Sequence, residues 1–214
     1  MTARDADRHG DDDYDRIYLD SAGSGGPPWD IGRPQPALAA VLDDRVRGPK
    51  VLDIGCGPGD LAIALGRRGY QVTAVDISSV AIDTARARAT RAGVSVRFEV
   101  GDATRLSLPD APFDSVFDSG LLHILHRAGG GRAEAYLRLL PGLAAPGASV
   151  FVLAVSRAAG EGWSLTEELL RAAFAAPDWV DTDVTGIDVT AEVGGEDLAL
   201  PGFLLRTVRA PAPA

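Results

Sequence analysis

The sequence predicts an α/β protein in which a parallel sheet carries helices on both faces. From Val51 onward, apolar strand-like runs alternate with stretches of helical periodicity, which is the pattern of such a sheet. The first run passes directly into a glycine-rich turn that opens a helical stretch. The last two runs flank Gly194-Gly195 with no helical stretch between them, which favours a closing antiparallel hairpin.

The elements are expected in a regular order along the chain. Strands are predicted at 50–54, 71–76, 94–100, 113–118 and 148–155, and the hairpin at about 179–190 and 198–209. Helices are predicted at 59–68, 78–92, 131–141 and 164–175. Before them, Leu38 to Val46 is typical of a short amphipathic helix that Gly48-Pro49 ends.

Composition excludes several classes of protein. The 214 residues suffice for one domain with its own core, and a net charge of -9 would repel a nucleic-acid backbone. No apolar run reaches the roughly 18 residues of a membrane span. Cys56 is the only cysteine and no signal peptide is evident. We therefore expect a cytoplasmic monomer or homodimer without a nucleic-acid or membrane partner; Lys50, the only lysine, suggests a GC-rich bacterial genome.

The N-terminal segment differs from the rest of the chain. Within residues 1–20, seven Asp against three Arg give a net charge of 3 − 7 = −4, and the start is expected to be disordered. Apolar residues at helical spacing then predict a short helix that can dock: Tyr14, Ile17, Tyr18 and Leu19. We expect residues 1–28 to be an acidic, partly disordered segment with a hinge, able to act as a lid, and residues 29–214 to form a single domain.

The glycine-rich turn follows the first strand and predicts a site for a nucleotide-like cofactor. Gly55, Gly57 and Gly59 lack the β-carbons that would keep the backbone away from a ligand. A dinucleotide fingerprint needs Gly-x-Gly-x-x-Gly, and Asp60 stands where its third glycine would fall. This departure argues against a pyrophosphate.

Two acidic residues that follow later strands indicate what the cofactor contains. Asp76 ends the second predicted strand, where a carboxylate can accept hydrogen bonds from both ribose hydroxyls. Asp102 follows the third strand, where it can accept from an adenine amino group. Capping of neighbouring backbone amides is the alternative role for both. Ribose and adenine without pyrophosphate point to S-adenosylmethionine.

With these residues the sequence resembles the class I S-adenosylmethionine-dependent methyltransferases. The matching motifs are the turn at 51–60, Val72 to Ser78, Gly101-Asp102, and Phe113 to Asp118, within roughly residues 30–155. The resemblance implies a Rossmann-like, doubly wound seven-stranded sheet with an antiparallel last strand.

The resemblance also implies how the cofactor is held. The turn at Gly55, Cys56, Gly57 and Gly59, together with Asp53, would surround the methionine end. Asp76 would take the ribose and Asp102 the adenine, while Ile77 packs on the adenine ring and the Ala103 N–H reaches it. The segments 28–36 and 119–125 are further similar to the branch that includes thiopurine, tellurite and thiol or halide methyltransferases, which methylate small acceptors.

Other candidate residues have two interpretations each. His123 can accept a proton from the acceptor or orient it as a catalytic group, or it can be a packed histidine bonded to the backbone. Asp118 can line the methyl-donor site or simply end its strand. Tyr14, Tyr18 and Trp29 can belong to the lid or to ordinary packing, whereas Cys56 is expected to be a spectator. His123 and His126 have no further ligand beside them, so we expect no metal site.

The predicted function is methyl transfer from S-adenosylmethionine to a sulfur, nitrogen or oxygen of a small-molecule acceptor, in specialised metabolism or detoxification. Such a reaction depends mainly on proximity and orientation, which agrees with the lack of an obvious catalytic triad or metal cluster in the sequence. A nicotinamide-dependent oxidoreductase and a non-catalytic cofactor-binding protein are the alternatives.

Overall fold

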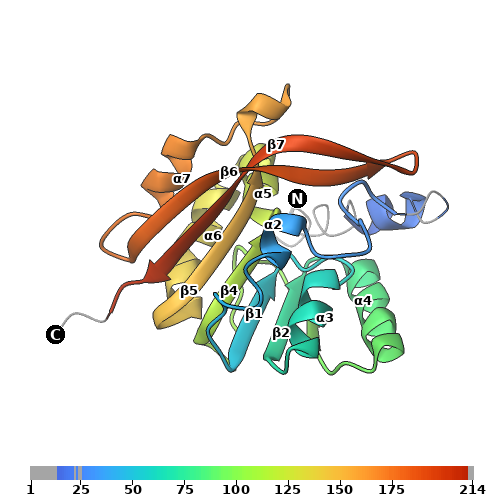
Figure 1. Cartoon of the computed structure of the whole chain (residues 1–214), viewed down its shortest axis with the longest axis horizontal. Coiled ribbons are helices and arrows are strands. Elements are labelled where there is room, and N and C mark those ends of the chain that lie inside the picture. The colour runs from blue at the N-terminus through green and yellow to red at the C-terminus, as the bar shows by residue number, and fades with distance from the viewer. Residues whose placement is uncertain (1–13, 22, 24–25, 212–214) are drawn as a thin grey trace, which may run out of the picture.

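A seven-stranded sheet forms the centre of the residues described by the computed structural model, which are 14–21, 23 and 26–211 (Figure 1). Its strand order is β3-β2-β1-β4-β5-β7-β6. Strands β1 to β5 are parallel, and β7 runs antiparallel to both β5 and β6. The bounds are β1 Lys50–Ile54, β2 Gln71–Asp76, β3 Arg97–Val100, β4 Phe113–Ser119, β5 Ala144–Val155, β6 Trp179–Val193 and β7 Glu196–Arg209. The predicted fold class, including the antiparallel last strand, is confirmed.

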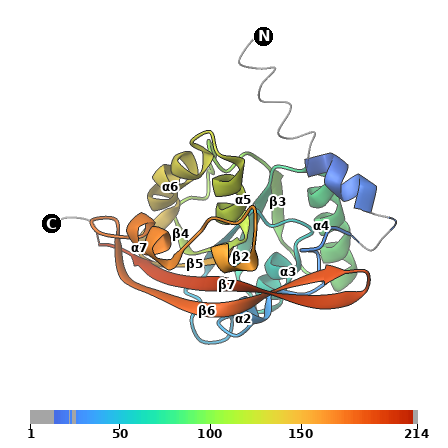
Figure 2. The ribbon, with the colours of Figure 1, turned by 90° about the horizontal axis from the view of Figure 1, so that it is seen from above.

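Helices cover both faces of this sheet, as seen from above in Figure 2. Residues 14–21 are helical as well. The other helices are α2 Pro36–Ala39, α3 Asp60–Arg67, α4 Ser79–Ala92, α5 Leu121–Ala128, α6 Arg132–Leu143 and α7 Glu167–Ala173, with the short 3-10 helix η2 at Arg157–Ala159. α5, α6 and α7 pack on one face, and α2, α3 and α4 pack on the other.

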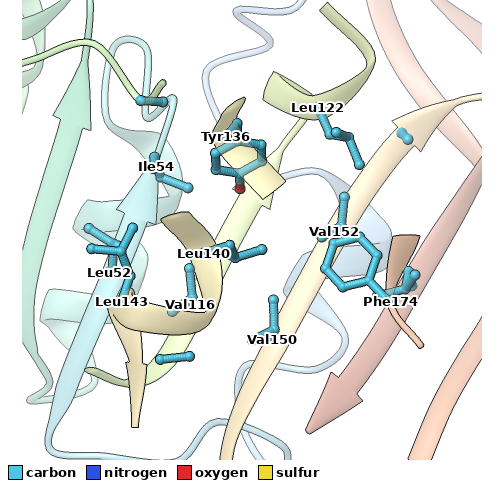
Figure 3. Packing of buried hydrophobic residues seen from close by; sticks show 14 of the residues in the cluster. Leu52, Ile54, Val116, Leu122, Tyr136, Leu140, Leu143, Val150, Val152 and Phe174 are labelled. Carbon is cyan, nitrogen blue, oxygen red and sulfur yellow. The ribbon is translucent and has the colours of Figure 1, made fainter. Parts of the chain in front are cut away.

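Alternating side chains of the central strands supply two hydrophobic cores. On β1, Leu52 and Ile54 belong to the core beneath α5, α6 and α7, whereas Val51 belongs to the opposite core. Figure 3 shows how Tyr136 and Leu140 of α6 pack over the first of these cores. Because β1 is buried on both faces, it is a nearly continuous apolar run, as expected for the middle of a parallel sheet. Lys50 at its half-buried start is charged, and Asp53 is the exception among its buried residues.

The structure corrects the prediction by one missed helix and in the bounds of several elements. β5 begins at Ala144 rather than 148. No helix is predicted at the position of α5. Its N-terminus lies at Gly120, which has a φ of 108°. β3 begins at Arg97 rather than 94, because Gly93 ends α4 in the left-handed conformation and the Val94 N–H bonds back to Ala89. The helix expected over 38–46 is confined to 36–39 and continues as turns.

The N-terminal part of the chain lies along the C-terminal hairpin. The Glu192 N–H donates to the Pro28 carbonyl at 2.7 Å, and the Gln35 side-chain amide bonds both backbone groups of Thr190, at 2.8 and 2.9 Å. These contacts pair part of the outer edge of β6, an edge that would otherwise expose backbone groups. The helix predicted around Tyr14 to Leu19 is confirmed at 14–21, while the expected disorder at the start of the chain lies outside the described residues.

Candidate cofactor site at the carboxyl edge of the sheet

The glycine-rich turn joins β1 to α3 at the carboxyl edge of the sheet. Gly55, Gly57 and Gly59 have φ angles of 73°, 51° and 87°, which favour glycine. The N–H groups of Gly55 and Cys56 both donate to the Val75 carbonyl, at 2.8 and 3.0 Å, and so tie the turn to β2. A β-carbon at Gly55 would lie 2.8 Å from the Leu121 β-carbon. The turn therefore depends on its glycines for both conformation and space.

Asp76 at the end of β2 is bonded to that turn. One of its carboxyl oxygens accepts from the Gly57 N–H at 2.8 Å, and the other accepts from the Ser78 N–H at 2.9 Å. Burial raises the pKa of Asp76, and these backbone N–H groups oppose the rise. Each carboxylate oxygen can accept more than one hydrogen bond. Asp76 thus keeps the capacity to accept from two ribose hydroxyls.

Asp53 of β1 is the least satisfied polar group near the turn. Its side chain is completely buried, and neither carboxyl oxygen has a hydrogen-bond partner among the described residues. Burial, followed by the neighbouring carboxyls of Asp76 and Asp118, raises the pKa of Asp53 to about 8. A buried polar group without a partner costs on the order of 1–3 kcal/mol. Such a group requires an explanation, and a cationic ligand at the turn would supply one.

Asp118 near the end of β4 acts as the cap of α5. Its carboxyl oxygens accept from the N–H groups of Gly120, Leu121 and Leu122 at 3.0, 2.7 and 3.1 Å. Burial raises the pKa of Asp118 to about 7, although the Tyr136 hydroxyl and these N–H groups oppose the rise. Asp118 is expected either to line the methyl-donor site or to end its strand. The contacts in the structure are those of a residue at the end of its strand. The same cap also holds Leu121 against Gly55.

The residues expected around the adenine lie together at the ends of β2 and β3, where the Gly101 N–H donates to the Asp76 carbonyl at 2.9 Å. One Asp102 oxygen accepts from the backbone and the hydroxyl of Thr104, both at 2.8 Å. The other lies 3.2 Å from the Arg105 Nε. Ala103 is buried and Ile77 is half-buried. Asp102 thus caps a neighbouring backbone amide, which is the alternative role considered for it. Its contact with adenine stays a prediction.

The helix at 14–21 reaches over the glycine-rich turn. The Tyr18 hydroxyl accepts from the Trp29 indole N–H at 3.1 Å and lies 3.1 Å from where a β-carbon on Gly57 would be. Burial and the carboxyl of Asp76 raise the pKa of Tyr18, so that its hydroxyl keeps its proton at neutral pH. The Trp29 side chain is 44% exposed, and Tyr14 is half-buried.

Asp15 of the same helix is a site residue that sequence reasoning missed. Its carboxyl oxygens accept from the hydroxyls of Ser78 and Ser79, at 2.6 and 2.9 Å, where α4 begins. Burial opposes ionisation, but hydrogen bonds from Ser78, Val80 and Ser79 together hold the pKa of Asp15 below its usual value. In the sequence Asp15 is one of seven acidic residues in a polar segment, so nothing singles it out.

His123 on α5 is packed and bonded to the backbone. Its Nδ1 accepts from the Val155 N–H at 3.2 Å, so Nε2 carries the proton of the neutral ring. Burial and the positive charge of Arg127 lower the pKa of His123 to about 4. The ring also meets Trp163 edge to face, with centroids 5.0 Å apart. Trp163, which follows η2, had no recognisable signal in the sequence.

The remaining predicted groups have simple environments. Burial raises the pKa of the Cys56 thiol well above its usual value, so that the thiol stays protonated, and its sulfur lies 3.6 Å from the Gly57 carbonyl. The Nδ1 of His126 lies 2.7 Å from the Ser164 hydroxyl. In the part of the chain that the structure describes, no group of three or more potential ligands could hold a metal ion, and no helix is long and apolar enough to cross a membrane.

Comparisons with known proteins identify the class that this fold and site define. The sequence profile of a family described as "Methyltransferase domain" matches residues 51–142. A 2-heptyl-1-hydroxyquinolin-4(1H)-one methyltransferase of Mycobacteroides abscessus is 34% identical over 134 residues, which cover 62% of this chain and 58% of that protein. A ubiquinone biosynthesis O-methyltransferase of Methylocella silvestris is 28% identical over 87% of each chain.

Solved structures share this fold over nearly the whole chain. A structure from work on the conversion of a disulfide bond into a thioacetal group during echinomycin biosynthesis superimposes with a TM-score of 0.84 and 30% identity, covering 96% of this chain and 95% of that one. A Burkholderia thailandensis 1,6-didemethyltoxoflavin-N1-methyltransferase shares the fold with a TM-score of 0.71 and 20% identity, over 98% of this chain and 91% of that one. The matched domain and the fold are those of the class I S-adenosylmethionine-dependent methyltransferases, which the sequence resembles. The cofactor of this family is the one predicted from the sequence.

Proposed function

We propose that the protein transfers the methyl group of S-adenosylmethionine to a sulfur, nitrogen or oxygen atom of a small-molecule acceptor. The observation that carries this proposal is the buried, unpartnered carboxyl of Asp53 beside a glycine-rich turn and Asp76. A cationic ligand of the turn would satisfy Asp53, and a ribose would use the remaining acceptor capacity of Asp76. The names of the relatives, which act on a hydroxyquinolone and in ubiquinone biosynthesis, support a small-molecule acceptor.

A sulfur acceptor in specialised metabolism has the best support among the three atoms. The structure that covers 96% of this chain comes from chemistry at a disulfide during the biosynthesis of echinomycin. A thiol has a pKa of about 8.5 and is partly ionised near neutral pH, so it needs little help from a base. A phenol or an alcohol would need more.

The residues around the turn have distinct proposed roles. Asp76 accepts hydrogen bonds from the ribose, and Ile77 packs on the adenine, which Asp102 and the Ala103 N–H contact at its edge. Asp53 and the turn at Gly55, Cys56, Gly57 and Gly59 surround the methionine end, while Asp118 keeps α5 and Leu121 against that turn. The cofactor supplies a methyl group that is already activated by the positive sulfur.

Orientation and exclusion of water are the chain's own contribution to the reaction. Holding donor and acceptor at near-attack distance lowers the barrier by about 7–11 kcal/mol in comparable intramolecular reactions. A pKa of about 4 makes His123 a poor proton acceptor at neutral pH, and its Nδ1 is already occupied. We therefore assign His123 an orienting role, in which Nε2–H donates a hydrogen bond to the acceptor.

The N-terminal segment is proposed to close the cofactor site. Asp15 anchors the helix at 14–21 to the start of α4, and Tyr18 presents its hydroxyl at Gly57 while Trp29 covers it. Residues 1–28 therefore act as a lid on the single domain formed by 29–214. Exclusion of water strengthens every electrostatic interaction inside such a site.

The proposed activity is tested by incubating the protein with methyl-labelled S-adenosylmethionine and a panel of thiols, disulfides, phenols and amines. We expect label on at least one acceptor, with thiols ahead of phenols. Asp76→Asn should reduce transfer at least tenfold, whereas Asp83→Asn, at a side chain that is 78% exposed on α4, should leave it unchanged.

Two outcomes would contradict this function. Binding of NAD in preference to S-adenosylhomocysteine would favour a nicotinamide-dependent oxidoreductase. Tight binding of the nucleoside without transfer to any member of the panel would favour a non-catalytic binding protein.

A further inference from the structure

Three carboxyl groups meet on neighbouring strands at the carboxyl edge of the sheet. Asp53 lies on the central strand β1, Asp76 on β2 and Asp118 on β4; in the register, Asp118 stands opposite Ile54, the residue after Asp53. Asp76 and Asp118 each receive backbone N–H groups. Asp53 is completely buried and neither of its oxygens has a hydrogen-bond partner among the described residues; only the Ala62 N–H lies near enough to oppose the rise of its pKa. The three groups therefore differ in how well their negative charge is compensated.

The charged groups that face Asp53 are acidic. Asp76 from β2 and Asp118 from β4 both act to keep it protonated, and so does Asp60 at the start of α3. Asp60 is itself paired with Arg88 at 3.0 Å. Other titratable groups nearby are neutral: the Cys56 thiol beside Asp53 and Asp76, Tyr18 over Asp76, and Tyr136 of α6 beside Asp118.

We propose that Asp53 distinguishes the charged methyl donor from the demethylated product by giving up a proton to solvent when a cation enters the site. This inference rests on the proposed function and deepens it. In the free protein, closely spaced carboxyls in a dry site cannot all be ionised, so the one that N–H groups compensate least retains its proton. A positive ligand compensates the missing N–H groups and makes the carboxylate the stable form.

The discrimination follows from the charges of the two ligands. The donor carries a positive sulfur that the product lacks, because methyl transfer leaves a neutral thioether. The carboxylate at Asp53 attracts the donor more strongly than the product, so the reaction itself weakens the hold on the product. The pKa values of Asp53 and Asp118, about 8 and about 7, place this exchange of a proton near neutral pH.

Titration calorimetry at pH 7, in two buffers with different ionisation enthalpies, measures the protons released on binding. We expect wild type to release up to one proton with S-adenosylmethionine and fewer with S-adenosylhomocysteine. The affinity for S-adenosylmethionine should rise by up to tenfold between pH 6 and 7, as required for release of one proton. Asp53→Asn should remove the share of the release that comes from Asp53 and reduce the preference for the donor, whereas Asp83→Asn should change neither.

The controls separate Asp53 from other sources of protons and from misfolding. The α-amino group of either ligand also titrates near pH 8, but its contribution is common to wild type and Asp53→Asn, so the difference between the two isolates Asp53. Circular dichroism checks that the variant is folded. If the variant does not fold, the difference in proton release between the two ligands, measured on wild type, tests the inference.

Equal proton release with donor and product in wild type, or unchanged release in a folded Asp53→Asn variant, would overturn the inference. Failure of wild type to bind either ligand would instead contradict the proposed function, and the inference with it.

Discussion

At the scale of single residues, Asp53, Asp76 and Asp118 have the same side chain in three different environments. Asp118 receives three backbone N–H groups and serves as a helix cap. Asp76 receives two and retains acceptor capacity. Neither oxygen of Asp53 has a hydrogen-bond partner among the described residues. Burial raises the pKa of all three and backbone N–H groups oppose the rise, while Asp53 has in addition the carboxyls of Asp76 and Asp118 acting against its ionisation.

The unusual environment of Asp53 predicts how stability changes with pH. Its pKa is about 8 in the folded protein and about 3.9 in an unfolded chain. The folded state therefore binds this proton more tightly, and its stabilising effect is lost as pH rises from about 4 towards 8. We expect Asp53 to lower the free energy of unfolding by up to about 1.4 kcal/mol per pH unit in this window. Asp118, with a pKa of about 7, acts in the same direction, and His123, with a pKa of about 4, acts in the opposite one, so the difference from Asp53→Asn isolates the contribution of Asp53.

Chemical denaturation of wild type and Asp53→Asn between pH 5 and 9 measures this effect. The variant should show a flatter profile and should be the more stable of the two at pH 9, because it cannot ionise. Parallel profiles for the two proteins would contradict the assignment of the raised pKa to Asp53.

At the scale of elements, the sequence predicts best where local chemistry decides the structure. β1 and β2 have the bounds predicted from their apolar runs, and Gly194-Gly195 lies between β6 and β7 as expected. α5 escaped prediction because its N-terminus depends on a carboxylate from the preceding strand and on Gly120, which the apolar run Leu121 to Leu125 does not reveal.

The residues of the candidate site also differ in whether the sequence predicts their positions. The positions of Asp76, Asp102 and the glycine-rich turn relative to the strands were predictable, because the carboxyl ends of parallel strands meet at one edge of a sheet. The contacts of Asp15 and Trp163 were not, because each joins segments that lie far apart along the chain: Asp15 to Ser78, and Trp163 to His123.

The proposed lid role of the helix at 14–21 can be tested by deletion. Removing residues 1–28 should weaken the affinity for S-adenosylhomocysteine about tenfold and lower turnover, because the anchor at Asp15 and the cover at Tyr18 are lost together. Tyr18→Phe alone should weaken binding by a smaller factor, since a single hydrogen bond contributes on the order of 1 kcal/mol. Calorimetry with Leu19→Ala as control, at a side chain that is 60% exposed, makes the comparison. Unchanged binding and turnover in the shortened chain would rule out the lid.

At the scale of the whole molecule, the fold brings the candidate residues to one place. The central strands β2, β1 and β4 end beside one another, so that acidic groups 23 and 42 residues apart along the chain, Asp53 to Asp76 and Asp76 to Asp118, share one edge. Two cores on opposite faces hold these strands in position. The N-terminal segment covers this edge with its helix at 14–21 and then contacts the C-terminal hairpin through Pro28 and Gln35.

The most direct test of the central claim, that this edge binds an adenosine attached to a positively charged sulfur, is a crystal structure of the complex with S-adenosylhomocysteine. We predict both ribose hydroxyls within hydrogen-bond distance of Asp76, the adenine between Ile77 and Asp102, and the methionine end at the glycine-rich turn beside Asp53. A nucleoside bound elsewhere on the molecule, with Asp76 bonded only to Gly57 and Ser78, would contradict the account.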